Sequence, residues 1–218
     1  SAGRAATAPI TLPSTLLPTT PATAATPELV RAVLHEAMQL HRAGDLALAE
    51  EAYRRVLRLQ PNDSDALHLL GLLAHQVGQN AVAVDLITRA IVIWPAAIYH
   101  NQLGNVLQAL GRTEEAIKSY TRAFLADPSN AMVHNNLGNA FQVLGRYDEA
   151  VASYRRALAI REDFADAYAN LGAVLQAQGK REESLACAER AVALAPDSAA
   201  AHNNWAVMLD AVGRRDEA

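Results

Sequence analysis

Asparagine and glutamine side chains recur at a fixed interval in this sequence, and their chemistry suits the binding of peptide bonds. Asn136, Asn170 and Asn204 follow one another at intervals of 34 residues. A carboxamide offers both a donor and an acceptor, so a row of them can hold the backbone of an extended polypeptide with little regard to its side chains. The candidate peptide-binding residues are Asn101, Asn105, Gln108, Asn135, Asn136, Asn139, Gln142, Asn170, Gln176, Asn203 and Asn204.

The elements that must position these amides also repeat. Apolar residues with helical spacing flank a glycine that returns about every 34 residues, so each interval predicts two helices joined by a turn. The turn glycines are Gly44, Gly78, Gly111, Gly145, Gly179 and Gly213. We expect the helical region to begin at Glu28 and later units to begin at Ser64, Ala97, Ala131, Ala165 and Ala199.

A second set of small residues indicates where the two helices of each unit touch. A glycine inside a helix costs about 1 kcal/mol relative to alanine, so its recurrence there implies a backbone contact that a larger side chain would block. Acidic pairs such as Glu114–Glu115, Asp148–Glu149 and Glu182–Glu183 at the start of a second helix suit the positive end of the helix dipole. The predicted contact positions are Gly71, Gly104, Gly138, Gly172, Ala83, Ala116 and Ala150.

This pattern resembles the tetratricopeptide repeat family. The matching residues of one unit are Leu137, Gly138, Phe141, Gly145, Ala150, Tyr154 and Ala157. The resemblance implies an all-α fold, a right-handed α-solenoid of helical hairpins over residues 28–218, with about five full repeats and a truncated sixth. Several units depart from the family pattern, with His100, His134, Tyr168 or His202 where tryptophan is frequent.

The asparagines are similar to the ladder in the N-terminal repeat region of O-linked N-acetylglucosamine transferases and their bacterial SPINDLY-like relatives. That resemblance implies a bacterial, non-catalytic recognition arm that feeds substrate polypeptide to a separate domain of a larger protein. It transfers to Asn136, Asn170 and Asn204, and less closely to Asn105 and Asn139. The carboxylate clamp of chaperone-binding repeats needs lysine and arginine in the groove, whereas this chain has mainly asparagine, glutamine and alanine there.

Two other interpretations stay open. The asparagines could be a solvated face of the repeat that no ligand occupies. The chain could instead be a self-assembling scaffold that forms homo-oligomers through repeat ends and convex surfaces. Because the sixth unit stops after its first helix, we expect the parent protein to continue past Ala218, and we expect Leu209 to lie on an open end face.

Composition excludes several other functions. A net charge of -4 gives no positive field for nucleic acid or an anionic membrane, and no apolar run is long enough for a membrane span. The lone Cys187 suits a reducing, cytoplasmic compartment and should pack between helices.

No catalytic constellation or cofactor motif is present, so we predict no enzyme activity and no cofactor. His35, His41, His68 and His75 raise a metal site as an alternative, but without ligand-spaced carboxylates we expect ordinary polar histidines.

Residues 1–27 differ from the rest of the chain. They are rich in proline, threonine and alanine, and Arg4 is their only charged side chain. Such a composition is typical of an extended tail or linker. At about 3.1 Å per residue the tail could reach across several repeats, so we predict that it binds an asparagine-lined groove, in the same molecule or a neighbouring one.

Overall fold

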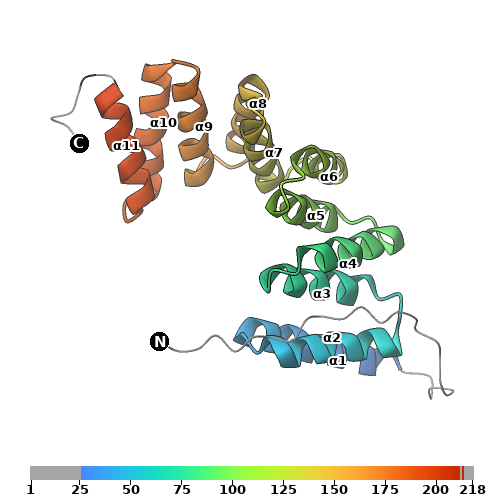
Figure 1. The fold of residues 1–218 in the computed structure, drawn as a ribbon. Coiled ribbons are helices and arrows are strands. Elements are labelled where there is room, and N and C mark those ends of the chain that lie inside the picture. Colours follow the sequence, from blue (N-terminus) through green and yellow to red (C-terminus); the bar gives the residue numbers. More distant parts are fainter. Residues whose placement is uncertain (1–25, 212, 214–218) are drawn as a thin grey trace. The chain divides into compact units, whose positions relative to one another are not determined.

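The computed structural model describes residues 26–211 and 213, and in this part of the chain it consists of helices joined by short turns, with no strand (Figure 1). The all-helical solenoid predicted from the sequence is therefore confirmed. The first helices of the repeats are α1 (Pro27–Ala43), α3 (Ser64–Gln76), α5 (Ala97–Ala109), α7 (Ala131–Val143), α9 (Ala165–Ala177) and α11 (Ala199–Ala211). The second helices are α2 (Leu46–Leu59), α4 (Asn80–Ile93), α6 (Thr113–Ala126), α8 (Tyr147–Ile160) and α10 (Arg181–Leu194).

The helix starts agree with the sequence pattern and have local causes. Five first helices begin at the predicted residues, while α1 begins at Pro27, one residue earlier than expected, because proline fits the first helical position without losing a hydrogen bond. Asp63 caps α3 by accepting a hydrogen bond from the backbone N–H of Ala66 at 2.8 Å. Asn130 caps α7 in the same way, accepting from Met132 at 3.1 Å.

The turn inside each repeat depends on its glycine. Gly145 follows α7 with a φ of +71°, and its N–H donates to the carbonyl of Gln142 at 2.9 Å. The N–H of Arg146 then donates to the carbonyl of Phe141, which satisfies a second group at the helix end. An L-residue with a side chain rarely adopts this φ, so glycine fixes the position at which α7 gives way to α8.

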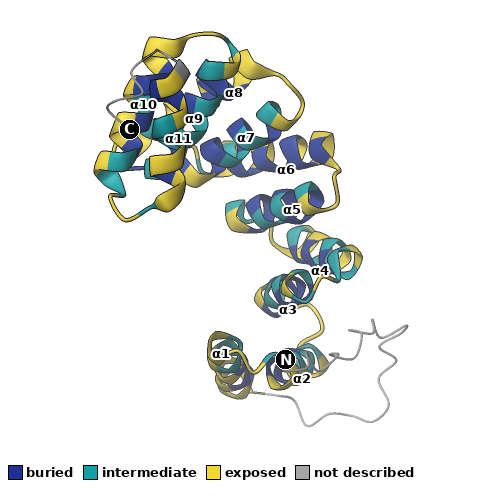
Figure 2. Cartoon of the chain, turned by 60° about the vertical axis from the view of Figure 1, so that its left-hand side comes forward, coloured by how far each residue is buried: buried dark blue, intermediate teal, exposed yellow. Residues whose placement is uncertain are grey.

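The chain divides after Arg112 into two units. The first unit contains α1 to α5, in which each helix packs against the next along the chain. Its buried residues lie toward neighbouring helices, as the dark blue faces in Figure 2 show. One core cluster joins α1, α2 and α3 through Val30, Val33, Val56 and Ala66.

The second unit contains α6 to α11, again with each helix against the next. One core cluster joins α8 and α9 through Ala150, Val151, Tyr154, Leu171, Val174 and Leu175. Cys187 packs against this cluster, as predicted, and burial raises the pKa of its thiol to about 11. The expectation that Leu209 lies on an open end face is wrong. Leu209 is fully buried against Leu185, Ala188 and Met208, because the side of α11 that carries it packs on α10.

Small residues bring α3 into direct contact with α4, and α7 into direct contact with α8. A Cβ atom placed on Gly138 of α7 would lie only 2.6 Å from Cδ1 of Tyr154 on α8. The corresponding atom on Gly71 of α3 would lie 2.7 Å from Cγ1 of Ile87 on α4. These contacts confirm that the recurring glycines serve helix packing.

A substitution at Ala150 tests which residues of α8 lie in the contact between helices. Its side chain is fully buried between α8 and its neighbours, whereas that of Ala152 two residues later is exposed. We expect Ala150→Leu to overpack the contact and lower the free energy of unfolding by about 1 to 3 kcal/mol. Ala152→Leu is the matched control and should cost less. Chemical denaturation measures both, and equal losses would contradict the packing arrangement.

His68 is a polar side chain inside the first unit. Its ring lies on that of Tyr99, with 4.5 Å between the ring centroids, and its Nε2 makes no hydrogen bond within the described residues. Burial lowers the pKa of His68 to about 4, although the Asp65 carboxylate partly opposes the effect. An unfolded histidine titrates near 6.5, so between these values the unfolded chain binds more protons than the folded one.

The free energy of unfolding should therefore fall as the pH is lowered from about 6.5 to about 4, by up to about 3 kcal/mol from this residue. Urea denaturation across this pH range measures the effect. His68→Leu should flatten the profile, since no proton can then be taken up at this position. The exposed His35 provides the control His35→Leu, and an equal flattening in both variants would contradict the assignment.

Candidate peptide-binding site

Amide side chains of two successive repeats are hydrogen-bonded to one another in the second unit. Asn170 of α9 donates through Nδ2 to the Oδ1 of Asn135 at 3.2 Å and to the Oδ1 of Asn139 at 3.1 Å, both on α7. Three of the predicted residues are thus brought together by the stacking of α9 on α7. These residues, with Gln142 and Tyr154, are named the amide cluster below.

Tyr154 of α8 fixes the other side of the amide cluster. Its hydroxyl lies 2.7 Å from the Oδ1 of Asn139 and 2.8 Å from the Oε1 of Gln142. A hydroxyl has one proton, so it donates to one of these amides, and the other must turn its NH₂ group toward the tyrosine oxygen. Burial raises the pKa of Tyr154, which keeps the hydroxyl protonated as a donor. In the sequence, Tyr154 was recognised only as one of the residues that match the repeat family.

The members of the amide cluster differ in accessibility. Asn135 is buried, with 7% of its surface exposed, so it supports Asn170 from below. Asn139, Gln142 and Asn170 are half-buried and keep part of their surface open to solvent. Within the amide cluster, Asn135 is therefore shielded from solvent, whereas Asn139, Gln142 and Asn170 are accessible to it.

The remaining predicted residues of the second unit lie on the same set of first helices. Asn136 of α7, Gln176 of α9 and Asn204 of α11 are half-buried, and Asn203 is exposed. Asn136, Asn170 and Asn204 occupy equivalent positions. The hydrogen bonds of Asn170, however, run to Asn135 and Asn139, which lie on either side of Asn136 in the sequence.

The predicted residues of the first unit lie on α5. Asn101 is buried, while Asn105 and Gln108 are half-buried. Asn105 donates through Nδ2 to the Oε1 of Gln102 at 3.1 Å, one helical turn earlier. This bond is one local contact of Asn105 along α5.

Two histidines of the first two repeats, His41 and His75, link neighbouring helices. The Nδ1 of His41 lies 3.2 Å from the hydroxyl of Tyr53, and its Nε2 lies 2.9 Å from the Oε1 of Gln76 on α3. The Nδ1 of His75 lies 2.7 Å from the Oδ1 of Asn80 at the start of α4. Among the described residues, no group of three or more histidine, cysteine or acidic side chains could hold a metal ion.

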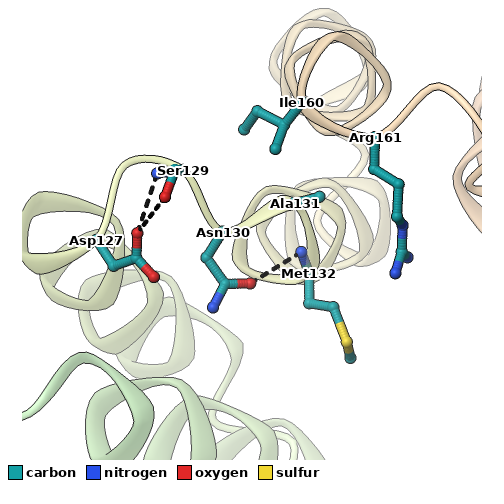
Figure 3. Close-up of a pocket in the computed structure, with 7 residues that line it drawn as sticks. All are labelled: Asp127, Ser129, Asn130, Ala131, Met132, Ile160 and Arg161. Carbon is teal, nitrogen blue, oxygen red and sulfur yellow. Dashed lines mark hydrogen bonds between the residues drawn. The ribbon is translucent and has the colours of Figure 1, made fainter.

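A hollow of about 430 Å³ lies where α7 begins and α8 ends, and the sequence pattern did not predict it (Figure 3). Most of its polar groups already have structural partners. The carboxylate of Asp127 accepts hydrogen bonds from the backbone N–H and the hydroxyl of Ser129, and Asn130 caps α7. Arg161 stacks on the ring of Phe164, 3.3 Å from its centroid. The full lining is Asp127, Ser129, Asn130, Ala131, Met132, Ile160 and Arg161.

Membrane insertion finds no support in the helices. None of those in the described part of the chain combines the length and the apolar character that a bilayer span requires.

Known proteins resemble this chain in fold. The solved structure of PilW, described as a widely conserved type IV pilus biogenesis factor, superposes with a TM-score of 0.79 at 20% identity, covering 88% of this chain and 89% of PilW. The structure of YrrB, described as a TPR protein with an unusual peptide-binding site, gives a TM-score of 0.66 at 22% identity, covering 78% and 89%. At these identities the likeness establishes the fold alone.

Sequence comparison identifies the family. The small glutamine-rich tetratricopeptide repeat-containing protein 2 of Mycosarcoma maydis is 32% identical over 92 residues, which are 42% of this chain and 26% of that protein. The chain thus spans about a quarter of that relative. Tetratricopeptide repeat models match residues 35–98 and 165–198, and a TPR repeat model matches residues 104–145 and 143–179. With these matches covering most of its helices, the chain belongs to the tetratricopeptide repeat family.

Proposed function

We propose that this chain is a protein-interaction module that binds an extended peptide through the amide side chains of its first helices. The observation that carries the proposal is the amide cluster, in which Asn170 bridges to Asn135 and Asn139 while Tyr154 holds Asn139. Side chains held by such contacts lose little conformational freedom when a ligand arrives, so more of the binding energy appears as affinity.

The cluster also suggests how a peptide is gripped. Because Asn170 directs its Nδ2 toward α7, its Oδ1 is the end that can accept a hydrogen bond from a peptide N–H. Asn139 uses its Oδ1 for Asn170 and Tyr154, so its Nδ2 is the end that can donate to a peptide carbonyl. Adjacent donor and acceptor ends match the alternation of an extended backbone.

Two comparisons support the proposal that this chain is the binding part of a larger protein. The description of YrrB as a peptide-binding repeat protein provides a precedent on the same fold. The relative from Mycosarcoma maydis is much longer than the matched segment, which is consistent with a repeat region serving as one part of a protein. We extend the proposal to a substrate-recognition arm of a larger bacterial, cytoplasmic protein, on the resemblance to the asparagine ladders described above.

A second candidate is a scaffold that assembles with copies of itself. It is favoured by exposed apolar side chains on the helices, such as Val143 and Val207 in the second unit. Light scattering over a range of protein concentrations separates the candidates. A mass that rises with concentration and is unaffected by changes in the amides would favour the scaffold.

Peptide binding can be tested by removing the three amides in register. The ligand probe is a fluorescein-labelled peptide of about 15 alanine, serine and threonine residues, which reaches about 50 Å when extended. Fluorescence anisotropy should detect binding to the unaltered chain. The triple variant Asn136→Ala, Asn170→Ala, Asn204→Ala should weaken it by about 10-fold to 1,000-fold, since each lost hydrogen bond contributes about 0.5 to 1.5 kcal/mol.

Gln60→Ala, at an exposed position after α2, provides a matched amide control and should bind the probe as tightly as the unaltered chain. Circular dichroism establishes that all variants remain helical. An unchanged Kd in a folded triple variant, or no binding of the probe to the unaltered chain, would contradict the proposed function.

A further inference from the structure

The surface of the first unit carries an exposed apolar patch where α4 ends and α5 begins. Val92 exposes 80% of its surface and Trp94 exposes 64%, and Ile93 and Ile98 beside them are also exposed. These four residues are named the Trp94 patch. Exposed apolar side chains gathered in this way on a soluble domain usually mark a contact surface.

The Trp94 patch interrupts the repeat pattern. In the other repeats the residue equivalent to Trp94 is Gln60, Asp127, Arg161 or Ala195. The helix that follows has no side-chain cap, since Ala96 precedes α5 as Phe164 precedes α9, whereas Asp63 and Asn130 cap α3 and α7. A missing cap costs about 1 kcal/mol, so helix stability does not explain these apolar residues.

The patch continues into a hollow of about 250 Å³. Val92 and Ile93 line it together with Leu67 of α3, so apolar surface reaches inward from the exposed patch. The charged groups at its wall are Arg89 and Asp85, which lie 3.8 Å apart as an ion pair. An uncharged apolar segment therefore fits this surface better than a charged one.

We propose that the apolar segment of the chain's own N-terminal tail, residues 10–17, docks on the Trp94 patch. This segment contains Ile10, Leu12, Leu16 and Leu17 between prolines and has no charged side chain. Proline-rich chain favours the extended polyproline conformation, which binds to surfaces that present aromatic and aliphatic side chains. Trp94 with its aliphatic neighbours provides such a surface.

The tail is long enough to reach the patch. It joins the fold at the start of α1, and because successive helices run in opposite directions, the start of α1 and the loop between α4 and α5 lie at the same side of the first unit (Figure 1). Packed helices are about 10 Å apart, so the step from α1 past α3 to α5 is about 20 Å. The nine residues between Leu17 and Pro27 span about 28 Å when extended.

Covalent attachment makes weak docking sufficient. A short flexible connection gives an effective concentration in the millimolar range, so an intrinsic Kd of about 1 mM already occupies the patch about half of the time. Four aliphatic side chains and several prolines can provide that affinity. Docking involves the first unit only, so it does not depend on peptide binding by the amide cluster.

Trp94 itself can report on the docking in the full chain. Trp205→Phe leaves Trp94 as the single tryptophan. In this background, changing Ile10, Leu12, Leu16 and Leu17 to serine should raise the acrylamide quenching constant of Trp94 about twofold, because the docked tail shields the ring. The matched variant Thr11→Ser, Thr15→Ser, Thr19→Ser, Thr20→Ser should leave quenching unchanged. Equal quenching in all three proteins would overturn the proposal.

Proteolysis distinguishes the patch from the amide cluster. Thermolysin cuts beside exposed leucine and isoleucine, and its rate follows the population of the undocked tail. Trp94→Ser should speed cleavage of the tail severalfold, whereas Asn139→Ala with Asn170→Ala should not. Faster cleavage only in the asparagine variant would place the tail on the amides and overturn docking on the patch.

The concentration dependence of quenching separates docking within one molecule from pairing of two copies. Docking in one molecule predicts the same Trp94 quenching at about 1 µM and about 50 µM, because the effective concentration is set by the chain. Shielding that appears only at the higher concentration, together with a doubled mass in light scattering, would show that a second copy covers the patch and would overturn the proposal.

Discussion

The close contact of two helices at a glycine is the interaction on which the rest of this structure depends. Gly138 has no side chain, so the ring of Tyr154 can lie directly on α7. The tyrosine is fully buried there, and its hydroxyl emerges beside Asn139 and Gln142. The same residue therefore packs the repeat and orders the amides of the proposed binding site.

The stacking of repeats extends this order to the next hairpin. Asn170 reaches back from α9 to two carboxamides of α7, so the distance between the repeats is matched to the length of these side chains. A buried amide oxygen without a partner would be costly, but the Oδ1 of Asn135 accepts this bond. Hydrogen bonds between these amides thus contribute to the stacking of the two repeats.

The regular features of the fold were predictable from sequence, but the contacts between its side chains were not. The regular spacing of the glycines predicted the first residue of five helices correctly, because turn geometry and helix packing require the same residue types at equivalent positions. The bonds of Asn170 depend on the rotamers of residues more than 30 positions apart, which periodicity does not specify. The expectation for Leu209 was wrong because its side of α11 packs on α10 and does not form the open face. The predicted position of the tail lies outside the described residues.

The residue type at the position of Tyr154 differs among the repeats. The equivalent residues are Tyr53, Ile87, Tyr120 and Ala188. Tyr53 directs its hydroxyl to His41, while Ile87 and Ala188 have no hydroxyl to offer. A hydroxyl that can hold the amides of the first helix, as that of Tyr154 does, is therefore not present at this position in every repeat. In the second unit, an extended polypeptide on the first helices would contact ordered amides beside Tyr154 and less ordered ones beside Ala188, so its register along these helices would be set at one repeat and not equally at all.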